Sequence, residues 1–561
     1  MTPSRLLVAS MALLLLLGCS EQQTYDILIK NGHIADGSGQ PMYFGDVGIN
    51  ADRIAAVGTL TNAKGLQEID ATGLTIAPGF INMLSWATES LIEDGRSESD
   101  IRQGVTLEVM GEGWSMGPLN ETMRAEEQSI QKDIKYTIEW TTLGEYLDYL
   151  ERKGISPNVA SFVGATTLRI YEMGEANRPP TPAELENMKA LAKTAMEEGA
   201  MGIGSSLIYA PAFYAATEEL IALCEVASAY GGMYISHMRS EGDYWLEAID
   251  ELLRIAKEAH IPAEIYHLKA GGKDNWGKWE AALAKIDSAR AAGLHITTDM
   301  YTYTAGATGL DASMPPWVQE GGYGKWAARL QDPAIRKKVI EEMKAKGNGW
   351  ENLYFAAGSA DKLILNGFRN DSLRYLTGKT LAEVAQMRGT GPEETAIDLV
   401  VQDSSRVGTV YFLMSEENVK KQIALPYMSF GSDAASISPV KPFTNYSPHP
   451  RAYGNVARLL GKYVREEKVI PLEDAVYKLS GLPATNLKLK KRGFLQVGHF
   501  ADLAIFNANT IMDKATFEEP HQFAKGMVHV FVNGEQVLKD GEHTGATPGR
   551  VVRGPGWKGQ N

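Results

Sequence analysis

The sequence predicts an α/β protein: a (β/α)8 TIM barrel with a small discontinuous β-sandwich contributed by both ends of the chain. Three observations lead there. Eight apolar, strand-like runs alternate with helical stretches in the middle of the chain. Both ends carry short alternating runs separated by NG and DG turns. Polar residues end several of the central runs, where a parallel barrel places its chemistry.

The composition is that of a large globular enzyme. The chain has 561 residues, of which 44% are hydrophobic and 22% charged, ample for one large core plus a smaller unit. The formal net charge is -14, and the sequence has no block of Lys or Arg. We therefore expect no nucleic-acid partner and no electrostatic binding to an anionic membrane surface.

The first 19 residues predict an export signal. Arg5 precedes an apolar run that ends in Leu16, Leu17 and Gly18 before Cys19. A run this short, bounded by a small residue and a Cys, is typical of a cleaved signal rather than of a spanning helix. The resemblance to bacterial lipoproteins implies that Cys19 is lipidated and anchors the chain in the cell envelope, at the outer membrane facing the periplasm. Acylation of Cys19 leaves Cys224, in a helical pattern, without a disulfide partner.

The β-sandwich is expected from residues 24–78 together with 490–550, whose alternating runs include TYDILIKNGHIADG and GMVHVFVNGEQVLKDGE. The barrel is expected at 79–489. Its strand candidates are TIAPGFINML, GVTLEVMG, PNVASFVG, AMGIGSS, GMYISH, PAEIYH, LHITTDMY and LPYMSFGS. The interval of about 305–425 is too long for one crossover, so it predicts an inserted lid or subdomain over the site.

Polar residues at strand ends predict a metal hydrolase. His237, His267, Asp299 and Asp433 each end a strand candidate, and these ends meet on one rim of a parallel barrel. Neutral imidazoles suit zinc, and a carboxylate beside a metal-bound water can accept its proton. Ser205 and Ser206 lie in GIGSSLIY, which lacks the G-x-S-x-G elbow of a serine hydrolase.

Across nearly all of the chain beyond residue 24, the sequence resembles the N-acyl-D-amino-acid deacylase (D-aminoacylase) family of the amidohydrolase superfamily. The matching strings are APGFI, RQGVT, SHMRSE, HLKAGGKDNWGK, DMYTYTAGATGL, GSDAA, HPRAYGNVARLLGKYVREE and GLPATNLKLKKRGFLQVGHFADLAIF. The resemblance implies an amidohydrolase-type barrel with His237 and His267 as zinc ligands and Asp433 as catalytic acid and base. It also implies that Lys269, Tyr209, Tyr301 and Arg451 hold the substrate's carboxylate and acyl arm.

Two departures from the family pattern concern the metal. The His-x-His pair that follows the first strand in the family is replaced by Leu84 and Trp86, which cannot coordinate zinc. The family's Cys after the second strand is replaced by Gly113, with Glu112 one residue earlier. Glu112 is our expected third ligand and Glu108 the reserve, since a carboxylate with two imidazoles is a known catalytic zinc set. We therefore expect one zinc ion per chain.

The leading hypothesis is a zinc-dependent hydrolase of N-acyl-D-amino acids that releases a carboxylate and a free D-amino acid. The D stereochemistry follows from the resemblance. One alternative is hydrolysis of another amide, such as a dipeptide or a cyclic amide, by the same centre. The other is a degenerate, non-catalytic envelope protein that binds a ligand, which Leu84 and Trp86 motivate.

Overall fold

Strands from both ends of the chain form one sheet. The computed structural model describes residues 23–559. Within these residues, the first five strands of the chain and its last four form one sheet. The strand order is β21-β20-β19-β18-β5-β1-β2-β3, with β4 beside β1. The antiparallel pairing of β5 with β18, Ala77 opposite Ala504, joins the two segments. The bounds are β1 Thr24–Ile34, β2 Tyr43–Asn50, β3 Arg53–Gly58, β4 Lys64–Asp70, β5 Thr75–Pro78, β18 Leu503–Phe506, β19 Met527–Val532, β20 Glu535–Lys539 and β21 Glu542–His543.

The central strands are parallel and follow one another in sequence order. They form a three-stranded sheet, β6-β7-β8, and a six-stranded sheet, β17-β13-β12-β11-β10-β9. β8 runs almost directly into β9, and Met83 N donates to Phe430 O at 3.1 Å beside the parallel bridge of Ser85 with Ala434. This order is consistent with the expected closed barrel. The bounds are β6 Phe80–Asn82, β7 Val105–Met110, β8 Asn158–Ser161, β9 Val163–Gly164, β10 Gly202–Ser206, β11 Met233–His237, β12 Ala263–Ile265, β13 Ile296–Met300 and β17 Met428–Phe430.

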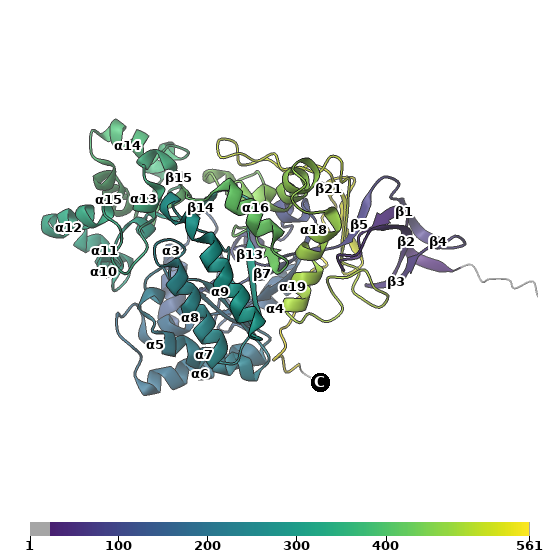
Figure 1. Cartoon of the computed structure of the whole chain (residues 1–561), viewed down its shortest axis with the longest axis horizontal. Coiled ribbons are helices and arrows are strands. Elements are labelled where there is room, and N and C mark those ends of the chain that lie inside the picture. Colours follow the sequence, from purple (N-terminus) through teal and green to yellow (C-terminus); the bar gives the residue numbers. More distant parts are fainter. Residues whose placement is uncertain (1–22, 560–561) are drawn as a thin grey trace, which may run out of the picture.

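Amphipathic helices connect these strands and lie outside them (Figure 1). In α8 the buried residues Trp245, Ile249, Leu252 and Ile255 recur every three to four positions, which places them on one face. The helices are α1 Ser90–Glu93, α2 Glu98–Ile101, α3 Glu121–Ile130, α4 Leu143–Lys153, α5 Ala165–Met173, α6 Pro182–Glu197, α7 Thr217–Ala229, α8 Trp245–Glu258, α9 Trp279–Ala291, α16 Glu416–Ala424, α17 Arg451–Arg458, α18 Leu472–Leu479 and α19 Gly481–Asn486.

The interval between β13 and α16 folds around a hydrophobic cluster of its own that includes Leu310, Val339, Leu365 and Val400. Its helices project from one end of the molecule (Figure 1). In its antiparallel sheet β16 lies between β14 and β15. The elements are β14 Ala305–Gly309, α10 Pro316–Gln319, α11 Tyr323–Arg329, α12 Pro333–Met343, α13 Leu353–Ala357, β15 Leu363–Gly367, α14 Leu381–Arg388, α15 Pro392–Asp403 and β16 Gly408–Phe412.

Short irregular helices complete the secondary structure. A π-helical stretch continues α17 over Leu459–Glu466. The 3-10 helices are Ala212–Tyr214, Lys273–Lys278, Leu310–Ser313, Ala360–Lys362, Asp371–Leu376 and Phe443–Asn445.

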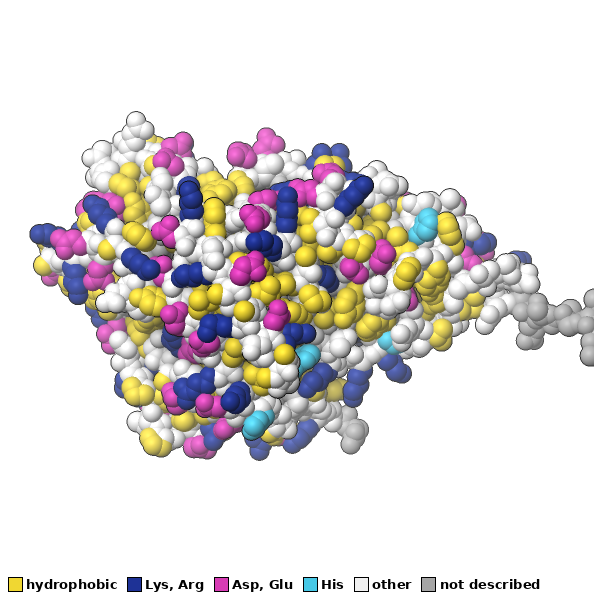
Figure 2. All heavy atoms as spheres, in the orientation of Figure 1, with side chains coloured by type: hydrophobic (Ala, Val, Ile, Leu, Met, Phe, Trp, Pro, Cys, Tyr) yellow, Lys and Arg dark blue, Asp and Glu magenta, His cyan; other side chains and the backbone are white. Residues whose placement is uncertain are grey.

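The predicted signal and lipidation site at Cys19 lie outside the described residues. In the part of the chain that is described, no helix is both long enough and apolar enough to span a bilayer. On the face drawn in Figure 2, Lys and Arg side chains are interspersed with Asp and Glu. That face therefore presents a mixed charge distribution rather than a single positive patch.

Candidate active site

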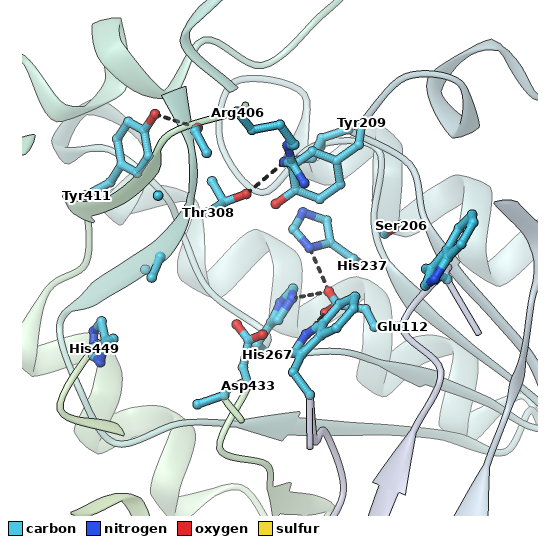
Figure 3. A pocket seen from close by; sticks show the side chains of 18 of the residues that line it. Glu112, Ser206, Tyr209, His237, His267, Thr308, Arg406, Tyr411, Asp433 and His449 are labelled. Atoms are coloured by element: carbon cyan, nitrogen blue, oxygen red, sulfur yellow. Dashed lines mark hydrogen bonds and ion pairs between the residues drawn. The ribbon is translucent and has the colours of Figure 1, made fainter. Parts of the chain in front are cut away.

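The strand ends deliver their polar side chains to one cavity. His237 is the last residue of β11, and His267 follows β12 by two residues. Glu112 follows β7 by two residues, and Asp433 follows β17 by three. All four line a cavity of about 750 Å³, and Figure 3 shows Glu112, His237, His267 and Asp433 close together within it. The C-terminal rim of a parallel barrel is where such chemistry is expected.

Glu112, His237 and His267 converge as a set of ligand atoms. Glu112 Oε1 lies 3.0 Å from His237 Nδ1 and 2.9 Å from His267 Nε2. One ligand atom from each of the three buried residues lies within 4.8 Å of the others. Two imidazole nitrogens and a carboxylate oxygen are the donors of a catalytic zinc site. The residues therefore fit the metal that the sequence implies.

The charges around this set favour a cation. Burial alone would raise the pKa of Glu112, but hydrogen bonds from His237 and His267 hold that pKa below its usual range. Burial and Lys269 oppose a charge on His267, yet Glu241 and Glu112 raise the pKa of His267 to about 10. The imidazoles thus stabilise the charged form of Glu112, and the negative potential of Glu112 and Glu241 stabilises positive charge at His267. A bound divalent cation would satisfy the same demand.

Glu241, which sequence reasoning missed, holds the far side of His267. Its Oε1 lies 2.7 Å from His267 Nδ1 and 2.5 Å from Lys269 Nζ. A carboxylate on the second ring nitrogen fixes the tautomer and orientation of a metal-binding imidazole. The available signal was its place four residues after His237 in SHMRSE. Lys269, expected to contact the substrate, is thus engaged by Glu241, although it also lines the cavity.

Asp433 and Arg451 form a buried ion pair, with Arg451 Nη2 2.8 Å from Asp433 Oδ2. The Arg451 guanidinium stacks 4.3 Å from the ring centroid of Tyr301. Its Nε and Nη1 are buried, and within residues 23–559 neither finds an acceptor. Buried donors of this kind are costly unless a ligand completes them. Burial raises the pKa of Asp433, and Arg451 works against that shift.

Tyr209 lies on the other side of the imidazoles. Its ring centroid is 5.2 Å from that of His237, and the guanidinium of Arg406 sits 4.8 Å from its ring. Arg406 comes from the inserted segment, and no motif in the sequence marked it. Burial raises the pKa of Tyr209 well above its usual value, so its hydroxyl stays protonated.

Glu108 and Asp299 do not join the ligand set. Glu108 Oε2 accepts a hydrogen bond from Asn82 at 2.9 Å, and its Oε1 accepts one from Ser97 at 3.1 Å. Asp299 Oδ1 accepts the backbone N–H of His267 at 2.7 Å. Glu108, the reserve ligand, is thus occupied elsewhere, and Asp299 supports the loop that carries His267.

Leu84 and Trp86 stand where the family pattern has its His-x-His pair. Leu84 is fully buried in an apolar cluster. Trp86 lines the cavity, and its indole Nε1 donates to Glu112 Oε2 at 2.9 Å. Neither side chain can bind a metal, so the first strand end contributes packing and one hydrogen bond.

Comparison with known proteins identifies the family of this chain. The model of the amidohydrolase family (Amidohydro_3) matches residues 67–538. The chain therefore belongs to the amidohydrolase family, and it is a hydrolase of amide bonds similar to D-aminoacylase. The resemblance seen in the sequence is confirmed.

Three relatives illustrate the match. D-aminoacylase of Alcaligenes xylosoxydans xylosoxydans is 34% identical over 535 residues, which cover 95% of this chain and 98% of that protein. A D-aminoacylase structure solved to study its binuclear metal centre is 32% identical with a TM-score of 0.79, covering 94% of this chain and 100% of that one. N-acyl-D-glutamate deacylase from Bordetella bronchiseptica, solved with zinc and a phosphonate inhibitor, is 29% identical with a TM-score of 0.78, covering 95% and 100%.

Proposed function

We propose that this protein is a zinc-dependent amidohydrolase that cleaves N-acyl-D-amino acids to a carboxylate and a free D-amino acid. One observation carries the proposal. The ligand atoms of Glu112, His237 and His267 converge in a cavity that also holds Asp433 and a buried Arg451, two nitrogens of which find no acceptor within residues 23–559. A hydrolytic centre and a carboxylate-binding cation thus face the same space.

Glu112, His237 and His267 would hold the zinc. When bound, zinc lowers the pKa of a coordinated water toward neutrality and polarises the amide carbonyl. Arg451 offers the N–H groups of Nη1 and its delocalised positive charge to the substrate's α-carboxylate. Because Arg451 occupies Oδ2 of Asp433, Oδ1 is the oxygen that accepts a proton from the attacking water. Asp433 then returns that proton to the leaving amine.

We further propose a single zinc ion per chain. Leu84 and Trp86 provide no ligands at the first strand end. D-aminoacylase has been described with a binuclear centre showing one-metal activation and second-metal attenuation. That description supports activity with one ion, and it argues that loss of the His pair does not by itself mean loss of catalysis.

The test joins metal content to enantiomer preference. Protein lacking residues 1–19 is purified without chelator and its metal measured by elemental analysis. It is then assayed with paired N-acetyl-D- and N-acetyl-L-amino acids. About one zinc per chain with cleavage of D substrates alone supports the proposal. Zinc without cleavage of either enantiomer would instead favour hydrolysis of another amide, and no zinc would favour the binding protein.

The location of the protein is a separate proposal. We propose that residues 1–19 direct export and that lipidated Cys19 anchors the protein in the bacterial envelope, facing the periplasm. The LLGC string at residues 16–19 supports this. Fractionation of cells producing the full chain or Cys19→Ser tests it. The natural chain should sediment with outer membranes, and equal sedimentation of both would contradict lipid anchoring.

A further inference from the structure

The two oxygens of Glu112 have different partners. Oε1 faces both imidazoles, at 3.0 Å from His237 and 2.9 Å from His267. Oε2 instead accepts the indole N–H of Trp86 at 2.9 Å. The carboxylate is therefore oriented by a donor that is not itself a ligand.

The backbone of Trp86 is fixed on both sides. Ser85 N donates to Val109 O at 2.9 Å, and Trp86 N donates to Ala434 O at 3.0 Å. The segment after β6 is thus tied to β7 and to the segment after β17. An indole nitrogen is only a donor, so it cannot replace Oε1 as a partner of the metal.

We propose that Trp86 is a positioning residue that holds Glu112 as a one-oxygen zinc ligand and thereby strengthens zinc binding. This inference rests on the proposed zinc site. Without the indole N–H, the Glu112 carboxylate is free to rotate and to present either oxygen to zinc. Part of the free energy of zinc binding is then spent on ordering that carboxylate. Outer partners of metal ligands typically change metal affinity by about 10- to 100-fold.

A simple packing role for Trp86 makes a different prediction. If the ring only fills space, phenylalanine keeps most of the apolar contact and zinc affinity stays the same. Trp114 provides a matched control. It is also half-buried and lines the cavity, and its indole nitrogen makes no hydrogen bond to any residue in the described range 23–559.

The experiment measures zinc affinity in metal-free protein by competition with a chromophoric chelator. We expect Trp86→Phe to bind zinc roughly tenfold or more weakly, with unchanged stoichiometry, and Trp114→Phe to match wild type. The absorption of the cobalt(II)-substituted protein should change in Trp86→Phe alone. If Trp86→Phe does not fold, Trp86→Tyr, which fills more of the same space, takes its place. Its zinc affinity is then compared with that of wild type in the same way.

The outcomes separate this inference from the proposed function. Equal zinc affinity of wild type and Trp86→Phe overturns the role of Trp86 and leaves the zinc enzyme intact. Failure of wild type to bind zinc overturns both.

A second, independent observation concerns Arg406 of the inserted segment. Its Nε donates to Asp311 at 2.7 Å and its Nη2 to Thr308 at 3.1 Å. The side chain remains 52% exposed while lining the cavity. Figure 3 shows Arg406 beside Tyr209 and Thr308, on the opposite side of His237 from Glu112.

A second cation, Lys132, shares this part of the cavity lining. Within residues 23–559, Lys132 forms no ion pair within 4.0 Å. Burial lowers the pKa of Lys132. The charge of Asp403 opposes that shift and the charge of Arg406 adds to it, so both Asp403 and Arg406 lie within electrostatic reach of Lys132. The nearby acids Glu127 and Glu175 have pKa values raised to about 7, chiefly by burial, and so carry less than full charge near neutrality.

We infer that Arg406 and Lys132 bind a second carboxylate of the substrate. The inference rests on the proposed function and narrows its substrate class to dianionic N-acyl amino acids. Arg451 would take the α-carboxylate on the Asp433 side, and Arg406 the second carboxylate beyond His237. That carboxylate belongs either to the amino-acid side chain or to the acyl arm.

Isosteric substrate pairs test the subsite. N-acetyl-D-glutamate is compared with N-acetyl-D-glutamine, and N-succinyl-D-alanine with its succinamoyl analogue. In at least one of the two pairs, Arg406→Gln should lower the ratio of kcat/KM for the acid to kcat/KM for its amide by roughly tenfold or more, since charged hydrogen bonds contribute at that level. Arg388→Gln on α14 is the control. An unchanged ratio in both pairs overturns the subsite.

If wild type cleaves neither these four compounds nor the N-acetyl-D-amino acids used to test the proposed function, that function fails. Binding of the four compounds to the zinc-loaded protein, measured by calorimetry, then decides the subsite. Acid-selective binding that is lost in Arg406→Gln supports it, and equal binding of acids and amides overturns it.

Discussion

Asp433 Oδ2 and Arg451 Nη2 form an ion pair at 2.8 Å. The two side chains are only 13% and 3% exposed to solvent. The pair joins the two tasks of the proposed reaction, because the expected proton acceptor and the expected substrate anchor are in contact. A change in either residue should therefore alter both catalysis and binding.

Replacing Arg451 by Met should shift the pH profile of kcat/KM. Burial raises the pKa of Asp433 and the positive charge of Arg451 lowers it, so removal of Arg451 raises that pKa further. Because Asp433 acts as a base only when ionised, the acidic limb of the profile should move to higher pH. The loss in kcat/KM at the optimum should be on the order of 30-fold or more, as for other truncated buried charge pairs. An unmoved acidic limb would mean that Asp433 is not the group that titrates.

Arg458 is the control for that experiment. It lies on the same helix, α17, but its Nη1 pairs with Asp513 at 3.0 Å rather than with Asp433. Arg458→Met should leave the position of the acidic limb unchanged, whatever it does to stability.

Asp433→Asn should abolish most turnover while leaving zinc in place. General base catalysis contributes about 10²- to 10⁴-fold, and the amide cannot accept the proton. Since Asp433 lies outside the ligand set, elemental analysis should give the same zinc content as wild type. Full activity in this variant would remove Asp433 from the mechanism.

Glu112→Gln and Glu108→Gln should separate the two candidate ligands. Glu112 is within 3.0 Å of both imidazoles, whereas Glu108 hydrogen-bonds to Asn82 and Ser97. We expect loss of zinc affinity only in Glu112→Gln. A ligand that binds only the folded state stabilises it by about 4 kcal/mol at 1,000 times its Kd, so zinc should also raise the Tm of wild type and of Glu108→Gln. A zinc-dependent Tm in Glu112→Gln would point to another third ligand.

The sequence predicted which residues line the candidate site better than it predicted which other side chains contact them. His237, His267 and Asp433 could be placed because each ends a strand, and parallel strand ends share one rim. Glu112 required the resemblance to a family, since a Glu two residues beyond a strand is common. It was chosen over Glu108 by its place in the alignment with the family pattern.

What the sequence left out depends on side-chain direction. Glu241 reaches His267 from another loop, and Arg406 reaches Tyr209 from the inserted segment, about 200 residues away in the chain. The contact of Arg406 has no periodic or local signature, and Glu241 is marked only by its place four residues after His237. Likewise, Trp86 could be recognised as a lost ligand, but its hydrogen bond to Glu112 appears only in three dimensions.

The last prediction concerns stability and a carboxyl below the active site. Glu264 of β12 is fully buried, and burial raises its pKa to about 7 even though Thr297, Ser429 and Asn486 donate to it. The folded state therefore binds more protons than the unfolded chain between the unfolded pKa, near 4.5, and about 7. By linkage, this group lowers the free energy of unfolding as pH rises through that window, by an amount on the order of 3 kcal/mol, and has no further effect above it. Glu264→Gln should remove that part of the decline. The free energies of unfolding measured by chemical denaturation at pH 5 and at pH 8 should therefore differ less than in wild type. Glu341→Gln, on the exposed face of α12, should retain the wild-type difference. An undiminished decline in Glu264→Gln would assign it to other buried acids.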